Sequence, residues 1–171
     1  MTRIYVGPTS LYKLGQVGEL ALLGAFDGDV VVPAPVIDEV AIEPTATNLA
    51  EFLESESVAT AVDEAYLEQA RSLLGEKQLG PAATVLAGVL AHRDPADRSA
   101  VAVVSEDRTV RRVAQGLGSA ITSSFGVVVR AAVEDDTLSP SAAKRIIRRM
   151  DQHGMHLTGE LRERAVGEVS G

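Results

Sequence analysis

Short apolar runs alternate with longer amphipathic segments along the chain. Continuous runs rich in valine are typical of strands that are buried on both faces of a sheet. We interpret as strands the residues 3–6, 29–32, 57–60, 100–104 and 119–122. Between them, apolar residues recur at helical spacing. The predicted helices cover 11–26 with breaks at Gly15 and Gly18, and then 36–42, 45–55, 63–74, 82–91, 107–116, 124–134, 139–153 and 158–169.

Strands that alternate with helices predict βαβ units, in which neighbouring strands run parallel. Right-handed crossovers then place helices on both faces of the sheet. We therefore expect an α/β fold with three layers, α/β/α, and a central parallel sheet whose middle strand is 3–6. A length of 171 residues suits a single domain. Its core is expected over about 1–135, with a helical C-terminal extension over 136–171.

The composition limits the chemistry. Apolar residues make up 46% of the chain, and cysteine is absent, which excludes disulfides and thiolate metal sites. The net charge is −8, with 24 acidic residues and only three lysines among 16 basic residues. This balance is typical of salt-adapted proteins, such as those of a halophilic archaeon; an ordinary acidic soluble protein is the alternative.

The charge and hydropathy also limit the partners. An overall negative charge argues against indiscriminate binding of nucleic acid, although it leaves room for a local basic patch. We find no leader-like apolar run at the N-terminus and no stretch of about 18 apolar residues that would span a bilayer. We therefore expect a cytoplasmic protein with no membrane partner.

Four phrases in this order resemble PIN-domain proteins. They are "TSLYKLGQVGEL", "DVVVPAPVIDEV", "AVVSEDRTVRRVAQGLG" and "SSFGVVVRAAVEDDTLSPSAAKRIIRRMDQHGMHLTGELRERA". The resemblance covers almost the whole chain and implies a compact α/β/α domain that forms a homodimer. It also implies an activity, because active members are metal-dependent ribonucleases and often the toxins of toxin–antitoxin pairs. In those members, three or four carboxylates at the strand ends hold Mg²⁺ or Mn²⁺, which activates water and neutralises phosphate charge.

Only part of that carboxylate set is present in this chain. The first position falls at Gly7, or at Pro8 if the register shifts by one, and the third falls at Ala82 in "GPAATVLAG", so none of these residues can ligate through its side chain. The second position matches Glu39, and the fourth matches Glu106, with Asp107 beside it. The resemblance thus implies a degenerate acidic site, in which these three acids are the remaining catalytic candidates and no metal is held.

Each acid also has a simpler interpretation. Glu39 could be a solvated helix residue, and Glu106 or Asp107 could cap the helix that follows, where an acid satisfies free N–H groups. In the other direction, Asp94 or Asp97 in "HRDPADR" could replace a missing ligand.

Two arginine triplets have i, i+3, i+4 spacing, which places three guanidinium groups on one side of each predicted helix. They are Arg108, Arg111 and Arg112, and Arg145, Arg148 and Arg149. Arginine binds phosphate with a planar fork of donors, so both triplets are candidates for nucleic-acid binding. The alternative is pairing with nearby acids on a solvated face.

These observations favour a catalytically degenerate PIN-like protein that acts by binding nucleic acid, RNA or DNA, or a protein partner, in a regulatory role. The first alternative is a metal-dependent endoribonuclease with a reduced carboxylate set. The second is a structural or oligomerisation subunit. No cofactor is expected, and Mg²⁺ or Mn²⁺ is needed only if nuclease activity survives.

Overall fold

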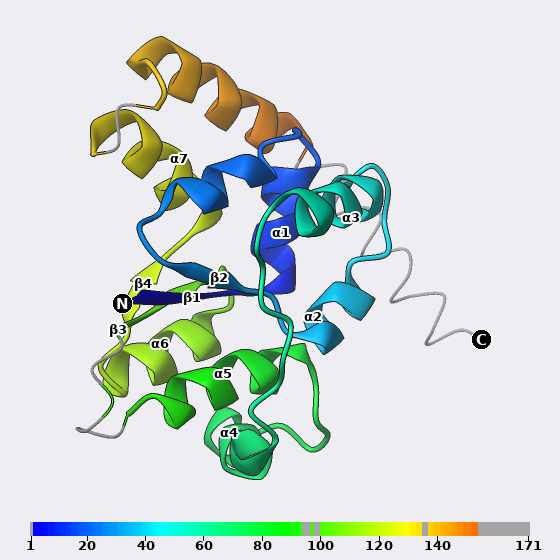
Figure 1. The fold of residues 1–171 in the computed structure, drawn as a ribbon, viewed down its shortest axis with the longest axis vertical. Coiled ribbons are helices and arrows are strands. Elements are labelled where there is room, and N and C mark those ends of the chain that lie inside the picture. The colour runs from blue at the N-terminus through cyan, green and yellow to red at the C-terminus, as the bar shows by residue number, and fades with distance from the viewer. Residues whose placement is uncertain (1, 94–96, 98–99, 135–136, 154–171) are drawn as a thin grey trace.

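The computed structural model describes residues 2–93, 97, 100–134 and 137–153. A sheet lies between two layers of helices (Figure 1). Its strands are β1 (Thr2–Val6), β2 (Asp29–Val31), β3 (Ala100–Val104) and β4 (Ala120–Thr122). The order is β2-β1-β3-β4, and all three pairings are parallel. The predicted three-layer fold with a parallel sheet is confirmed. The strand expected in the middle of the sheet is also confirmed, because Tyr5 of β1 pairs with Val31 on one side and with Val103 on the other.

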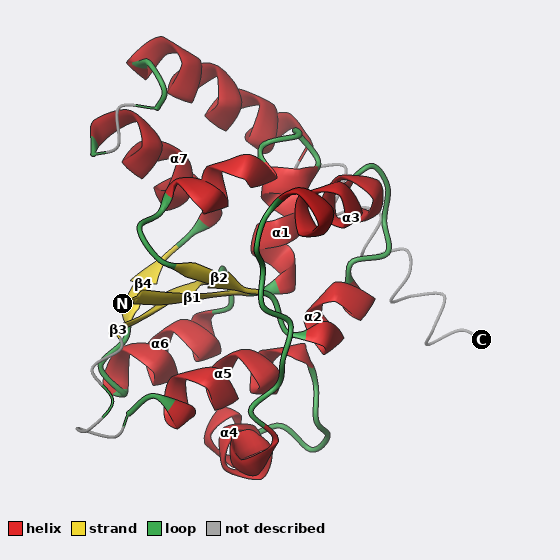
Figure 2. Ribbon diagram, viewed as in Figure 1, coloured by secondary structure: helices red, strands yellow, loops and turns green. Residues whose placement is uncertain are grey.

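Helices cover both faces of the sheet, as the colouring by secondary structure shows (Figure 2). On one face lie α4 (Leu67–Leu74), α5 (Pro81–Ala91) and α6 (Arg108–Gly116). On the other lie α1 (Pro8–Gly15), the 3₁₀ helix η1 (Leu20–Ala25), α3 (Thr45–Ser55) and α7 (Ser124–Val133). Helix α2 (Ala34–Glu39) follows β2, and the 3₁₀ helix η2 (Glu64–Tyr66) precedes α4.

Residues 140–153 are also helical, as expected. Ile146 and Met150 on this helix are buried in the same core as the strands. The helix therefore packs as part of the domain. The predicted helix over 158–169 lies outside the described residues. No helix in the described part of the chain has the length and apolar character needed to cross a membrane.

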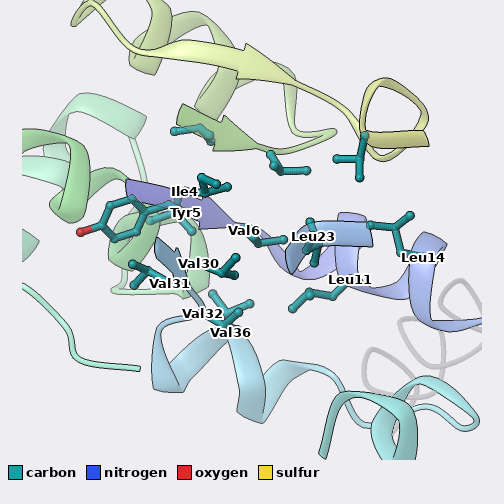
Figure 3. Close-up of a cluster of buried hydrophobic side chains, with 14 of the residues drawn as sticks. Ile4, Tyr5, Val6, Leu11, Leu14, Leu23, Val30, Val31, Val32 and Val36 are labelled. Carbon is teal, nitrogen blue, oxygen red and sulfur yellow. The ribbon is translucent and has the colours of Figure 1, made fainter. Parts of the chain in front are cut away.

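The core depends on the alternation of side chains along β1. Val6 lies beside Leu11 and Leu23, which come from α1 and η1 (Figure 3). Tyr5 points to the opposite face of the sheet and packs against Gly88 of α5. A Cβ at residue 88 would lie only 2.1 Å from the Tyr5 ring, so glycine permits this close approach.

The breaks expected at Gly15 and Gly18 in the helix over 11–26 are confirmed, because α1 ends at Gly15 and Gly18 adopts a left-handed φ of 72°. The chain then continues as η1. The strand expected over 57–60 is reduced to a single parallel bridge between Val31 and Ala59.

The helix expected over 63–74 also begins differently. It starts with the 3₁₀ turn η2, which directly follows Asp63. Among the described residues, the Asp63 side chain accepts no capping hydrogen bond. Its carboxylate instead accepts a hydrogen bond of 3.4 Å from the Tyr5 hydroxyl, which ties this segment to β1. Burial and the nearby Asp63 charge raise the pKa of Tyr5 to about 12.

Candidate functional site

A cavity of about 200 Å³ opens at the edge of the sheet where β1 and β3 end. In open α/β sheets, ligands bind at this carboxyl edge of the strands. Four helices and the loops after β1 and β3 supply the residues that line the cavity: Gly7, Pro8, Thr9, Glu39, Pro81, Ala82, Val85, Ser105, Asp107 and Val110. The structure therefore brings together four of the positions that the sequence comparison singled out, Gly7, Glu39, Ala82 and Asp107.

Gly7 has room for a side chain. Its backbone is extended, with φ −86° and ψ 165°, a conformation open to any residue. A Cβ at this position would lie 3.7 Å from the Ser105 hydroxyl oxygen and from the Val104 carbonyl oxygen, which is ordinary van der Waals contact. Packing therefore does not require glycine here, and a carboxylate at residue 7 would lie beside the cavity.

Ala82 lies in the first turn of α5, directly after Pro81. That turn contains no acidic residue, although a carboxylate would interact favourably with the positive end of the helix dipole. Together with Val85 one turn later, Ala82 makes this wall of the cavity apolar. Two sides of the cavity thus lack the charge that a divalent cation needs.

Glu39 ends α2, and its side chain is exposed. Its backbone is held by Tyr12 of α1, a residue that sequence reasoning missed. The Tyr12 hydroxyl donates to the Glu39 carbonyl oxygen at 3.0 Å. The same hydroxyl accepts hydrogen bonds from the N–H groups of Ala41 at 2.8 Å and Ile42 at 3.2 Å. A tyrosine in an apolar helix pattern gave no sign of this contact.

Glu106 is not one of the residues that line the cavity. Its carboxylate accepts hydrogen bonds from the Ser10 hydroxyl, from the Ser124 N–H at 2.7 Å and from the Ser124 hydroxyl at 2.5 Å. Both serines are fully buried, in the first turns of α1 and α7. Glu106 therefore joins two helices across the end of β3, and it does not cap α6 as one interpretation proposed.

Asp107 does cap α6. Its Oδ1 accepts from the N–H groups of Thr109 at 2.9 Å and Val110 at 3.0 Å, as the capping interpretation predicts. The same carboxylate lines the cavity. Asp97, by contrast, pairs with His92 (Nδ1 to Oδ2, 2.6 Å) at the C-terminal end of α5, whereas the cavity lies at the N-terminal end of that helix. Asp97 thus does not replace a missing ligand, and Asp94 lies outside the described residues.

The residues present do not fit a divalent-ion site of the kind that the resemblance implies. Within the described part of the chain, no three His, Asp or Glu side chains are grouped so that they could hold a metal ion. Among the described residues that line the cavity, only Glu39 and Asp107 are acidic, and one oxygen of Asp107 is already used by two N–H groups. Mg²⁺ demands near-ideal octahedral oxygen ligation, which this arrangement does not provide.

The first arginine triplet is divided between two roles. Arg111 donates to the carbonyl oxygens of Ser105 at 2.7 Å and Thr122 at 3.1 Å, so it joins the ends of β3 and β4. Arg108 and Arg112 are exposed on α6. Only these two of the three side chains therefore face solvent as the binding interpretation requires.

The second triplet differs from the first, because Arg145, Arg148 and Arg149 are all exposed, beside exposed Lys144. Arg149 nevertheless has a partner in the fold, since it donates to the Val17 carbonyl oxygen at 3.1 Å. Arg149 also lies near Glu19, whose pKa is raised by burial and lowered in part by this arginine. Because α6 and helix 140–153 lie on opposite sides of the sheet (Figure 1), the two triplets do not form one surface.

Comparison with known proteins gives a match that covers almost the whole chain. A family model described as a PIN domain matches residues 6–170. The match begins at the last residue of β1 and includes every residue that lines the cavity. None of the curated proteins matches the chain.

Proposed function

This chain belongs to the PIN-domain family, and we propose that it is a catalytically degenerate member that acts by binding in place of cutting RNA. The observation that carries the proposal is the composition of the cavity at the strand ends, where Gly7 and Ala82 stand in place of carboxylates. A metal ion in such a site stabilises the developing charge by several kcal/mol and acidifies its bound water. A cavity that holds the ion poorly loses both effects.

The positions of the remaining acids support the same conclusion. Glu106 is engaged by Ser10 and Ser124, and Asp107 caps α6. Both carboxylates thus have structural partners in the fold without any metal ion. Glu39 also lines the cavity, and its side chain is exposed. Within the described residues, the structure shows no such partner for its carboxylate.

The test is to restore the missing charge. In Gly7→Asp with Ala82→Glu, we expect cleavage of a mixed RNA pool in the presence of Mn²⁺, whereas the wild type is inert. The matched control is Gly7→Asn with Ala82→Gln, which adds side chains of the same size without charge and is expected to remain inert. Robust cleavage by the wild type would contradict the proposal.

One observation favours a second candidate function, a metal-dependent endoribonuclease with a reduced ligand set. Glu39 and Asp107 line the same cavity, and Mg²⁺ sites sometimes use only one or two carboxylates together with substrate phosphates. In that case, wild-type cleavage with Mg²⁺ or Mn²⁺ would be abolished by Glu39→Gln. A matched Glu43→Gln change, on the exposed loop after α2, would leave cleavage unchanged.

We propose nucleic acid as the first ligand to examine, because exposed Lys144, Arg145 and Arg148 concentrate positive charge on helix 140–153. Arg145→Gln with Arg148→Gln should weaken binding to every sequence about equally. Each lost phosphate contact should reduce the slope of log affinity against log salt by roughly 0.7–0.9. Lys77→Gln, an exposed change before α5, is the control. Absence of any wild-type binding at low salt would exclude nucleic acid and favour a protein ligand or a structural subunit.

A further inference from the structure

Apolar side chains make up half of the lining of the cavity at the strand ends. They are Pro8, Pro81, Ala82, Val85 and Val110. The volume of about 200 Å³ is below the roughly 300–1,000 Å³ that drug-sized ligands usually occupy. The cavity therefore suits one compact ring system with apolar faces, and it is too small for a larger ligand.

The charged groups of the cavity are hydrogen-bond acceptors. Glu39 lines the cavity, and its carboxylate has no hydrogen-bond partner in the part of the chain that the structure describes. Asp107 uses Oδ1 to cap α6, and within the described residues its Oδ2 accepts no hydrogen bond. An ionised carboxylate accepts hydrogen bonds and cannot donate them. A ligand of this cavity must therefore present N–H groups to the two acids.

Ser105 adds a buried donor. The residue is only 5% exposed, and its Oγ accepts the Asp107 N–H at 3.1 Å. Among the described residues, no group accepts the proton of this hydroxyl. Its Oγ lies 3.7 Å from the position that a Cβ at Gly7 would occupy, so it faces the cavity. Because an unsatisfied buried donor is costly, a carbonyl oxygen of the ligand is stabilised at this point.

Helix N-termini offset part of the acidic charge. Helices α1, α5 and α6 begin at the cavity, since Pro8 and Pro81 are the first residues of two of them and Asp107 caps the third. Each N-terminus is equivalent to roughly half a positive charge. Three such ends offset most of the charge of Glu39 and Asp107. The cavity therefore favours a neutral ligand with a donor edge over a cation.

We propose that the cavity binds the guanine base of one nucleotide, either extruded from single-stranded RNA or free in solution. The Watson–Crick edge of guanine combines adjacent N–H donors, at N1 and N2, with the carbonyl oxygen O6. The N–H groups bind the carboxylates of Glu39 and Asp107, and O6 accepts from Ser105. Proteins recognise unstacked RNA bases along this edge. The inference rests on the proposed function, because it names the ligand of a cavity that holds no metal ion.

The other bases match the cavity less well. Adenine and cytosine place an acceptor nitrogen beside their amino group, and that nitrogen meets the carboxylates unfavourably. Uracil has a single N–H between two carbonyl oxygens. A well-formed bidentate contact discriminates against the wrong base by a factor of roughly five to 150 in affinity. Guanine should be preferred by a factor in this range.

The phosphate of the nucleotide stays outside the cavity, where Arg108 is exposed. Arg108 follows Asp107 directly, at the start of α6. Arg111, one turn later, is held by the carbonyl oxygens at the strand ends. Guanidinium groups bind phosphate through a planar fork of donors. Guanosine monophosphate (GMP) should thus bind more tightly than guanosine. Arg108→Gln should remove this difference, whereas Arg112→Gln, an exposed change on the same helix, should preserve it.

Titration of the full chain with nucleoside monophosphates, followed by calorimetry and by amide chemical shifts, tests the pocket. GMP should shift the amides of Gly7, Ala82 and Ser105 and should bind at least about fivefold more tightly than AMP, CMP or UMP. Inosine monophosphate, which lacks only the N2 amino group, should lose most of this advantage. Glu39→Gln should also reduce it, whereas the control Glu43→Gln should leave it unchanged.

Two uridine nonamers, one with a single central guanosine, distinguish the sources of the base. If the guanosine-containing nonamer binds more tightly than GMP, the ligand is an RNA base. If GMP binds at least as tightly, the ligand is a free nucleotide. Either result places guanine in the cavity.

Equal affinity for all four nucleotides, or shifts confined to helix 140–153, would overturn the assignment of guanine. Shifts of the cavity amides by arginine methyl ester and not by GMP would also overturn it and would indicate a protein ligand. The cleavage assay keeps the two proposals separate. An inert wild type without guanine preference contradicts this inference alone, whereas RNA cleavage by the wild type contradicts the proposed degenerate site.

Discussion

Removing the Tyr12 hydroxyl tests how the Glu39 side of the cavity is held. Tyr12 is only 3% exposed, and its hydroxyl makes three hydrogen bonds to the segment 39–42. Tyr12→Phe keeps the ring and its packing but leaves two N–H groups and one carbonyl oxygen without this partner. Each such hydrogen bond contributes about 0.5–1.5 kcal/mol net, and an unsatisfied buried group costs more.

The expected loss is smaller than the sum of three full hydrogen bonds. Glu39 and Ala41 are exposed, so water can replace part of what the hydroxyl provides. We expect Tyr12→Phe to lower the free energy of unfolding by about 1–3 kcal/mol. With an m value of about 2 kcal/mol/M in urea, the midpoint should fall by about 0.5–1.5 M at unchanged m.

Urea unfolding followed by circular dichroism measures this shift. Tyr66→Phe is the matched control, because it is the same chemical change, loss of a tyrosine hydroxyl, at an exposed residue. It should change the midpoint little. A loss below about 0.5 kcal/mol for Tyr12→Phe, the range of ordinary surface substitutions, would refute the view that this hydroxyl holds the end of α2.

Three further predictions concern packing, capping and pH. Gly88→Ala should lower stability by about 1–3 kcal/mol in a thermal melt, because the added methyl group overlaps the Tyr5 ring; an unchanged melting temperature would contradict this contact. Asp107→Ala should cost about 0.5–2 kcal/mol in urea unfolding through loss of the α6 cap, and Asp107→Asn should recover most of that loss. Burial raises the pKa of Glu19 above its ordinary value of 4.5, so the folded state keeps a proton that the unfolded chain has lost, and stability falls as the pH rises through that range. Melts of Glu19→Gln should therefore show a gain over the wild type at pH 7 that disappears near pH 4, and an equal effect at both pH values would exclude this linkage.

The fold could be predicted from the sequence because its signals are local. The valine runs at 30–32 and 101–104 identify buried strands from neighbouring residues alone, and their alternation with helices fixes parallel pairing. The division of the predicted helix over 11–26 depends on Gly18, whose left-handed backbone changes the direction of the chain.

The side-chain contacts of the site could not be predicted in the same way. Glu106 meets a serine 96 residues earlier in the chain, and Arg111 finds two carbonyl groups at strand ends. No periodicity encodes such contacts, because they form only when the strands and helices have assembled. The sequence therefore indicated which acids are present. Only the folded structure shows that Glu39 and Asp107 line the same cavity and that Glu106 is not one of the residues lining it.

The room at Gly7 has a genetic consequence. Some glycine codons differ from aspartate codons by a single base, and some alanine codons differ from glutamate codons equally little. A Cβ at residue 7 meets only ordinary van der Waals contacts, so the first atom of an added side chain displaces none of its neighbours. Under selection for RNA cleavage, two point mutations thus lead toward a carboxylate set of the PIN type, and the reverse path is just as short.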